Sequence, residues 1–178
     1  FGQILGKYDL TKLNKNEKYE IIFQLGQTIK YFHSKEHVYR DFKLDNIIID
    51  ANKNGILIDF DRLVDINEQK TIDLISEFIS PEYFTNFKFS YENEYESLRC
   101  MHHYLFIGEK PKSRNRIAKL AYFSLKDDFF NFGKNLFENK SNIQDIGKAI
   151  FYYKLAANQN DPNAQLDLGV IYYEGKYI

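Results

Sequence analysis

Residues 39–61 of this 178-residue chain read YRDFKLDNIIIDANKNGILIDFD. Two short apolar runs, 47–49 and 56–58, flank a polar segment that ends in an Asn-Gly pair. This pattern is typical of a β-hairpin with a longer loop. The strands of a hairpin are antiparallel, so Asn46, before the first, and Asp59, after the second, should lie at its open end. The polar loop that carries Asp41 opens at the same end.

The side chains expected at this open end are those that phosphoryl transfer needs. Asp41 can accept a hydroxyl proton, and Lys43 can place a positive charge on a transferring phosphoryl group. Asn46 and Asp59 offer the oxygen ligands that Mg²⁺ prefers. Positioning and charge neutralisation supply most of the catalysis in this reaction, so the set suits it chemically.

Residues 39–46 resemble the catalytic loop of protein kinases, H/Y-R-D-L-K-x-x-N, and residues 58–61 resemble the metal-binding D-F-G segment. Ser80-Pro81-Glu82 resembles A-P-E, which closes the activation segment. Residues 94–98 and 108–111 resemble the D-x-x-S-L start of the large central helix and the G-x-x-P after it. Each motif is weak alone, but their shared order and spacing indicate kinase ancestry.

The resemblance implies a protein serine/threonine kinase that takes ATP as substrate, uses Mg²⁺ and phosphorylates protein hydroxyls. Asp41 and Lys43 would be catalytic, with Lys43 also touching the γ-phosphate of ATP. Asn46 and Asp59 would hold the metal and help to bind the nucleotide.

The resemblance also suggests how such a kinase would be regulated, and it shows two positions at which this sequence departs from the family pattern. Arg40 is a candidate to pair with a phosphate on the activation segment, where Thr71 and Ser76 are candidate phosphosites. Asp61 replaces the Gly of D-F-G, and Glu94 replaces an Asp that braces the catalytic loop in the family. The chain begins at Phe1, which suggests a fragment, and shows none of the motifs of the lobe that holds ATP. We therefore expect it to be inactive alone.

The last part of the chain repeats itself at an offset of 36 residues, with Phe132-Gly133 echoed by Leu168-Gly169. Small and large residues alternate there at helical spacing, and a proline at Pro162 can start a helix. The pattern resembles Sel-like repeats, relatives of tetratricopeptide repeats, at Ala149, Tyr152 or Tyr153, Ala156, Ala157, Ala164, Leu168, Gly169, Tyr172 and Gly175. The resemblance implies about one and a half helical units that bind a protein partner.

The fold class that these observations predict is α+β, mainly α. A partial protein-kinase-like large lobe with a short catalytic-loop hairpin covers residues 1–112, and an α-solenoid repeat segment covers residues 113–178. Helices are expected over residues 17–33, with Asn14 and Glu17 as a capping box, and over residues 94–107. Residues 61–80 are expected to form an irregular surface loop.

Composition excludes several other classes of protein. The net charge is −1 and no long basic run is present, so nucleic acid and anionic membrane surfaces are not expected partners. No apolar run approaches the ~20 residues needed to span a bilayer, and no signal peptide is recognisable. A single cysteine, Cys100, fits a reducing compartment, so a cytoplasmic location is predicted.

Two alternative functions remain open from the sequence. One is a pseudokinase adaptor whose kinase-like half only binds while the repeats recruit partners, which Asp61 favours. The other is a small-molecule phosphotransferase of the aminoglycoside or choline kinase type, in which I-D-F-D-like sequence also occurs. Lys43 and Ser80-Pro81-Glu82 argue against the second alternative.

Overall fold

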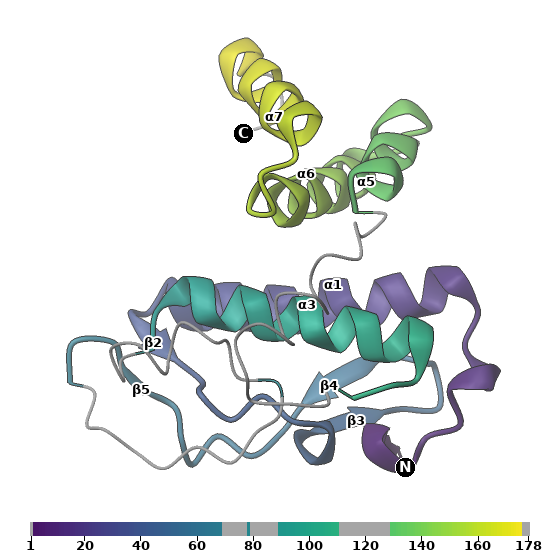
Figure 1. Cartoon of the computed structure of the whole chain (residues 1–178), viewed down its shortest axis with the longest axis vertical. Coiled ribbons are helices and arrows are strands. Elements are labelled where there is room, and N and C mark those ends of the chain that lie inside the picture. The colour runs from purple at the N-terminus through teal and green to yellow at the C-terminus, as the bar shows by residue number, and fades with distance from the viewer. Residues whose placement is uncertain (1, 69–77, 79–88, 111–128, 176–178) are drawn as a thin grey trace. The chain divides into compact units, whose positions relative to one another are not determined.

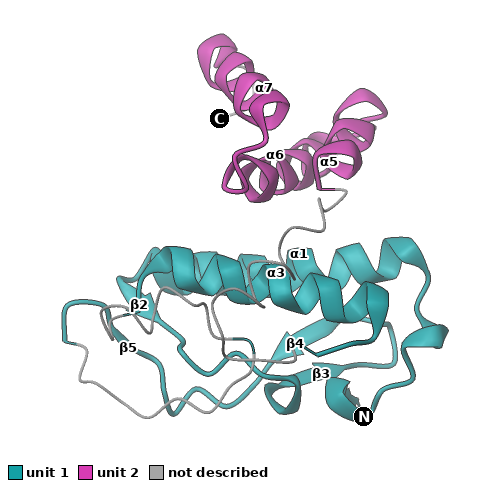
Figure 2. Ribbon diagram, in the orientation of Figure 1, with its two compact units in different colours: residues 1–123 teal, residues 124–178 magenta. Residues whose placement is uncertain are grey.

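The computed structural model describes residues 2–68, 78, 89–110 and 129–175. The chain divides into two compact units, residues 1–123 and residues 124–178 (Figure 2). Among the described residues, no helix has both the length and the apolar character needed to cross a membrane. Several predicted features lie outside the described residues, namely Thr71, Ser76, Ser80-Pro81-Glu82 and the boundary at residues 112–113.

The predicted hairpin is present in the first unit. β3 (Ile47–Ile49) pairs antiparallel with β4 (Gly55–Leu57), and β1 (Gln3–Ile4) pairs with the other edge of β3. Ile47 and Ile49 are buried, which gives the hairpin one face toward the core. The hairpin thereby fixes where the residues before and after it lie.

A second small sheet corrects one expectation from the sequence. β2 (His37–Val38) pairs antiparallel with β5 (Val64–Asp65). The expectation of an irregular loop over residues 61–80 is therefore wrong for Val64 and Asp65. A two-residue strand is too short to leave the alternating pattern by which strands are recognised.

Two long helices lie side by side over the hairpin of the first unit (Figure 1). α1 (Lys15–His33) begins at the predicted capping box, in which Asn14 and Glu17 exchange hydrogen bonds of 3.0 and 2.7 Å. Ile21, Ile22, Leu25 and Ile29 of its apolar face are fully buried, and the helix packs on β4. α3 (Tyr91–Ile107) starts three residues before the predicted position and ends at Gly108, whose φ is 79°.

The second unit consists of three described helices, α5 (Phe129–Glu138), α6 (Ile143–Ala157) and α7 (Pro162–Glu174). α6 packs against both of the others. The predicted helix start at Pro162 is confirmed: the Asp161 carboxylate accepts hydrogen bonds from the first turn of α7, and the proline needs no hydrogen-bond partner there.

Candidate active site

The loop between β2 and β3 carries the predicted catalytic residues. It ends in a single 3₁₀ turn, Leu44–Asn46, directly before β3. The carbonyl of Asn46 accepts a hydrogen bond of 2.9 Å from the N–H of Ile58, which continues the hairpin ladder past its strands. Asn46 thus lies opposite Ile58, and Asp59 follows at the same open end.

Asp41 is the buried centre of this loop, with 5% of its surface exposed. Its Oδ2 accepts hydrogen bonds of 2.8 Å from both Lys43 Nζ and Asn46 Nδ2. Asn46 Nδ2 also donates to the Asp41 carbonyl at 3.1 Å. The structure therefore brings three of the four predicted active-site residues into direct contact, around one carboxylate.

Tyr39 links this cluster to the fourth residue, Asp59. The Tyr39 ring is fully buried, and its hydroxyl donates to the carbonyl of Ile58 at 2.6 Å. Burial raises the pKa of Tyr39 well above its ordinary value, and the nearby charges of Asp41, Asp59 and Glu94 act in the same direction. Asp59 itself is exposed, and its Oδ1 lies 3.5 Å from the N–H of Asp61.

The chemistry of the donors fits a magnesium ion. The two hydrogen bonds from Asn46 to Asp41 use Nδ2, so Oδ1 is the atom of this amide that could bind a cation. The Asp59 carboxylate is a second hard oxygen donor at the open end. Nowhere in the described residues do three His, Cys, Asp or Glu side chains cluster as a metal site. Mg²⁺ bound through phosphates and water needs only one or two side chains, so the pair is sufficient.

Glu94 holds the loop between β2 and β3, although its side chain is longer than the aspartate of the family pattern. Its Oε1 accepts the backbone N–H groups of Tyr39, at 2.5 Å, and Arg40, at 2.9 Å. Its Oε2 lies 2.7 Å from Nε2 of His33. Arg40, which Glu94 holds, has φ of 65°, a left-handed conformation that is unfavourable for a side-chain-bearing residue.

Two residues of this site were missed by sequence reasoning. His33 was interpreted only as the end of a helix, and Arg62 belonged to the presumed loop. Arg62 Nε lies 3.9 Å from Asp41 Oδ2, and the Arg62 carbonyl accepts a hydrogen bond of 3.0 Å from Arg40 Nε. Neither residue belongs to a motif, so no local signal marks them.

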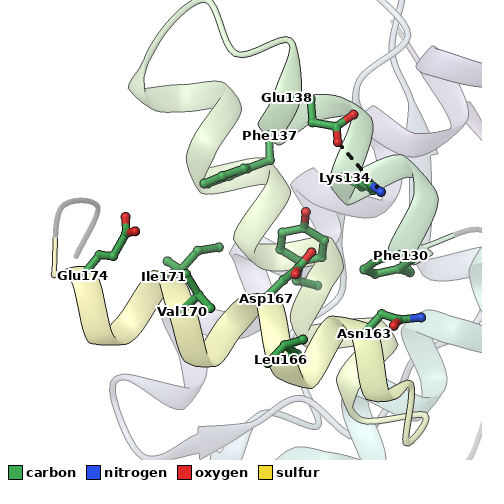
Figure 3. A pocket seen from close by; sticks show the side chains of 11 residues that line it. Phe130, Lys134, Phe137, Glu138, Asn163, Leu166, Asp167, Val170, Ile171 and Glu174 are labelled. Atoms are coloured by element: carbon green, nitrogen blue, oxygen red, sulfur yellow. Dashed lines mark ion pairs between the residues drawn. The ribbon is translucent and has the colours of Figure 1, made fainter.

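A separate groove lies in the second unit, between α5 and α7 (Figure 3). Its volume is about 620 Å³, and Tyr153 of α6 contributes to its wall. Burial raises the pKa of Tyr153, as do the charge of Asp167 and its hydrogen bond to the phenol. The residues that line this α5–α7 groove are Phe130, Lys134, Phe137, Glu138, Tyr153, Asn163, Leu166, Asp167, Val170, Ile171 and Glu174.

Comparison of the chain with known proteins finds similarity to protein kinases. The family model described as protein kinase domain matches residues 5–160. The meiosis-specific serine/threonine-protein kinase MEK1 of Saccharomyces cerevisiae is 34% identical over 80 residues, 41% of this chain. The cell cycle serine/threonine-protein kinase CDC5/MSD2 of the same yeast is 33% identical over 71% of the chain. A probable serine/threonine-protein kinase of Dictyostelium discoideum is 28% identical over 82% of it. The aligned parts span 16%, 18% and 26% of these relatives, respectively.

Proposed function

The chain belongs to the protein kinase domain family, and from this we propose that in its full-length form it transfers the γ-phosphate of ATP to serine or threonine hydroxyls of a protein. The observation that carries the proposal is the buried Asp41 carboxylate, held by Lys43 and Asn46 at 2.8 Å each. A carboxylate fixed by two donors has a defined direction, which a proton acceptor for a substrate hydroxyl requires.

The proposed roles follow from the chemistry of each side chain. The substrate hydroxyl oxygen forms a bond to the γ-phosphorus, the bond from that phosphorus to the bridging oxygen breaks, and ADP leaves. Asp41 takes the hydroxyl proton, and Lys43 neutralises charge on the transferring group. Asn46 and Asp59 would hold Mg²⁺, which when bound neutralises phosphate charge.

The direct test is phosphate transfer by the full-length protein from labelled ATP to a mixture of protein substrates. Asp41→Ala should abolish the transfer, a loss of at least about a thousandfold. Asp45→Asn is the matched control, because Asp45 lies in the same loop but is exposed. Transfer that survives Asp41→Ala would contradict the assigned role.

A pseudokinase adaptor is the alternative suggested by Asp61. Asp61 is exposed and is not among the described residues with positive φ, so this position does not require glycine. What Asp61 does add is a second carboxylate, close to the place where the phosphates of ATP would bind. Binding of Mg-ATP by the full-length protein without transfer that depends on Asp41 would favour the adaptor. Transfer to amino alcohols or sugars in place of proteins would favour a small-molecule phosphotransferase.

We also propose that the second unit is a Sel-like repeat segment that binds a protein partner. The supporting observation is the α5–α7 groove, whose lining combines aliphatic and aromatic side chains with three carboxylates and one lysine. Such a lining suits an amphipathic helix with basic residues beside its apolar face. The competing assignment makes these helices part of the kinase lobe, since the kinase match extends to residue 160.

A labelled synthetic helix with leucines on one face and lysines beside them would test the groove, with a glutamate version for comparison. We expect the lysine version to bind the chain more tightly, and Val170→Arg to weaken its binding at least about fivefold. Gln144→Arg is the control, because it adds the same charge at an exposed position outside the groove. Equal binding of both peptides, or equal loss in both variants, would count against the groove.

A further inference from the structure

A cavity lies in the first unit at the end of the hairpin away from Asp41 and Asn46, where β3 runs into the loop before β4. Its volume is about 330 Å³, at the lower end of the range of about 300–1,000 Å³ for small-molecule sites. The segment from β1 to the 3₁₀ turn Leu10–Lys12 forms its other side. The lining of this hairpin-end cavity includes Tyr8, Lys12, Ile49, Asp50, Ala51 and Lys53.

The ammonium group of Lys53 is positioned at this cavity by Tyr8. Its Nζ donates a hydrogen bond of 2.6 Å to the Tyr8 hydroxyl and lies 5.3 Å from the centre of the Tyr8 ring. The hydrogen bond raises the pKa of Lys53, which keeps the group charged at neutral pH. This contact uses one of the three ammonium hydrogens, and the hydroxyl that accepts it still has its own hydrogen to donate. Lys53 and Tyr8 can therefore donate to one ligand together.

Asp50, the carboxylate of the lining, is engaged by its own loop. Its Oδ1 accepts the backbone N–H groups of Asn52 and Asn54 at 2.8 Å each, and its Oδ2 accepts Asn54 Nδ2 at 2.9 Å. Among the described residues, no carboxylate lies within ion-pair distance of Lys12 or Lys53. The negative charge of the lining is therefore bound to donors of the hairpin loop, and a negative ligand would meet the two lysines.

Two carboxylates outside the lining lie within electrostatic range of these lysines, Asp9 and Glu17. Glu17 Oε2 accepts the N–H of Asn14 at 2.7 Å, and Asp9 Oδ1 accepts the N–H and the hydroxyl of Thr11 at 3.1 and 2.7 Å. Each carboxylate therefore caps the start of a helical segment, and neither lines the cavity.

We propose that the hairpin-end cavity binds a phosphate group, with Lys53, Lys12 and the Tyr8 hydroxyl as its donors. A phosphate monoester carries a charge of about −1.5 to −2 at pH 7 and three strong acceptor oxygens, which suits three donors, two of them cationic. A carboxylate brings one charge and two oxygens. Ile49 and Ala51 add apolar surface that the organic part of a monoester could contact. The site is separate from the cluster around Asp41, so the inference does not depend on the proposed kinase activity.

NMR titration of the complete chain with sodium phosphate, at constant ionic strength and about pH 7.5, tests the site without any need for catalysis. The backbone amides of Ala51 and Lys53 should shift in a saturable way, while those of Lys43 and Asn46 should not follow the same curve. Sodium acetate should bind at least about fivefold more weakly than phosphate. Glycerol 2-phosphate identifies the source of the group: tighter binding than phosphate indicates a phosphorylated organic ligand, and equal binding indicates the free anion.

Substitutions then assign the donors. Lys53→Asn should weaken phosphate binding at least about fivefold, and the loop should still form because asparagine tolerates the left-handed φ of 67° at this position. Lys12→Gln and Tyr8→Phe should each weaken binding at least about threefold. Lys30→Gln is the control, because it removes the same charge from an exposed position of α1 outside the cavity. Its affinity should stay within about 1.5-fold of the unaltered chain.

Three results would overturn the proposal. The first is the absence of saturable shifts at Ala51 and Lys53 in the unaltered chain, a measurement that needs no variant to fold. The second is acetate binding as tight as that of phosphate, which would show a general attraction of anions. The third is an equal loss of affinity in Lys53→Asn and Lys30→Gln. Phosphate binding at this cavity without transfer that depends on Asp41 would leave this inference intact and remove only the proposed function.

Discussion

The two proposed magnesium ligands, Asn46 and Asp59, differ in how much the fold depends on them. Asn46 is 4% exposed and donates two hydrogen bonds to Asp41. Asp59 is exposed, and its carboxylate accepts one long contact from a neighbouring amide. Asn46 therefore supports the loop as well as offering an oxygen, whereas Asp59 contributes its carboxylate oxygens and a left-handed backbone with φ of 62°.

Alanine substitutions should separate these roles. Asn46→Ala removes the buried donor from Asp41 and should lower the free energy of unfolding by about 1–3 kcal/mol. Asp59→Ala should lower it by no more than about 1 kcal/mol, the cost of placing alanine at the left-handed φ of 62° that Asp59 adopts. Urea denaturation of the chain measures both values. Both variants should lose magnesium-dependent phosphate transfer in the full-length protein. A similar loss of stability in the two variants would contradict the distinction.

In the second unit, α5 and α6 approach each other closely at Gly133. A Cβ added at Gly133 of α5 would lie 3.2 Å from the Ala149 carbonyl oxygen and 3.2 Å from the Tyr152 Cβ, both in α6. Gly169 of α7 stands 36 residues further along, in the echoed sequence pattern, yet an added Cβ there meets nothing within 4 Å. The same residue in the same sequence pattern is thus confined by packing in one helix and not in the other.

This contrast predicts opposite effects of one substitution. Gly133→Ala should destabilise the second unit by about 1–3 kcal/mol, because rigid atoms of α6 must move. Gly169→Ala should stabilise it by about 0.5–1 kcal/mol, since alanine loses less backbone entropy in a helix. Thermal or urea unfolding of the two variants compares them. Stabilisation by both substitutions would show that α5 and α6 are not closely packed.

In the hairpin, the most visible sequence motif, the Asn-Gly pair, is not what makes the turn. The Asn-Gly pair was expected to make the turn, but the left-handed residue of the loop is Lys53, with φ of 67°. Gly55 instead begins β4, where an added Cβ would lie 2.7 Å from Ile21 Cγ2 of α1. The glycine therefore permits the helix to approach the hairpin.

At the scale of the whole molecule, each unit buries a tyrosine with a raised pKa. Burial is the main cause for both Tyr39 and Tyr153, and nearby carboxylates add to it. The ordinary tyrosine pKa is 10.0. Above that pH the unfolded chain loses phenolic protons that the native chain retains. The free energy of unfolding should therefore fall as the pH rises through and above 10.

Phenylalanine substitutions test this pH dependence. Urea denaturation at about pH 8 and about pH 11 should show a smaller alkaline loss of stability in Tyr39→Phe and in Tyr153→Phe than in the unaltered chain. At the lower pH, Tyr39→Phe should cost about 0.5–1.5 kcal/mol, because its hydrogen bond to Ile58 is lost. Tyr173→Phe is the control, since Tyr173 is 93% exposed. An alkaline loss unaffected by either buried substitution would contradict the prediction.

The sequence by itself determined the hairpin, the capped helix after Asn14, the helix start at Pro162 and the kinase family, because each depends on residues close together or on ordered motifs. Only the tertiary structure decided the pairing of β2 with β5, the contact of His33 with Glu94 and the contrast between Gly133 and Gly169. These depend on segments far apart in the chain that meet through packing. Packing distances leave no periodic signal in a single sequence, whereas caps and hairpins do.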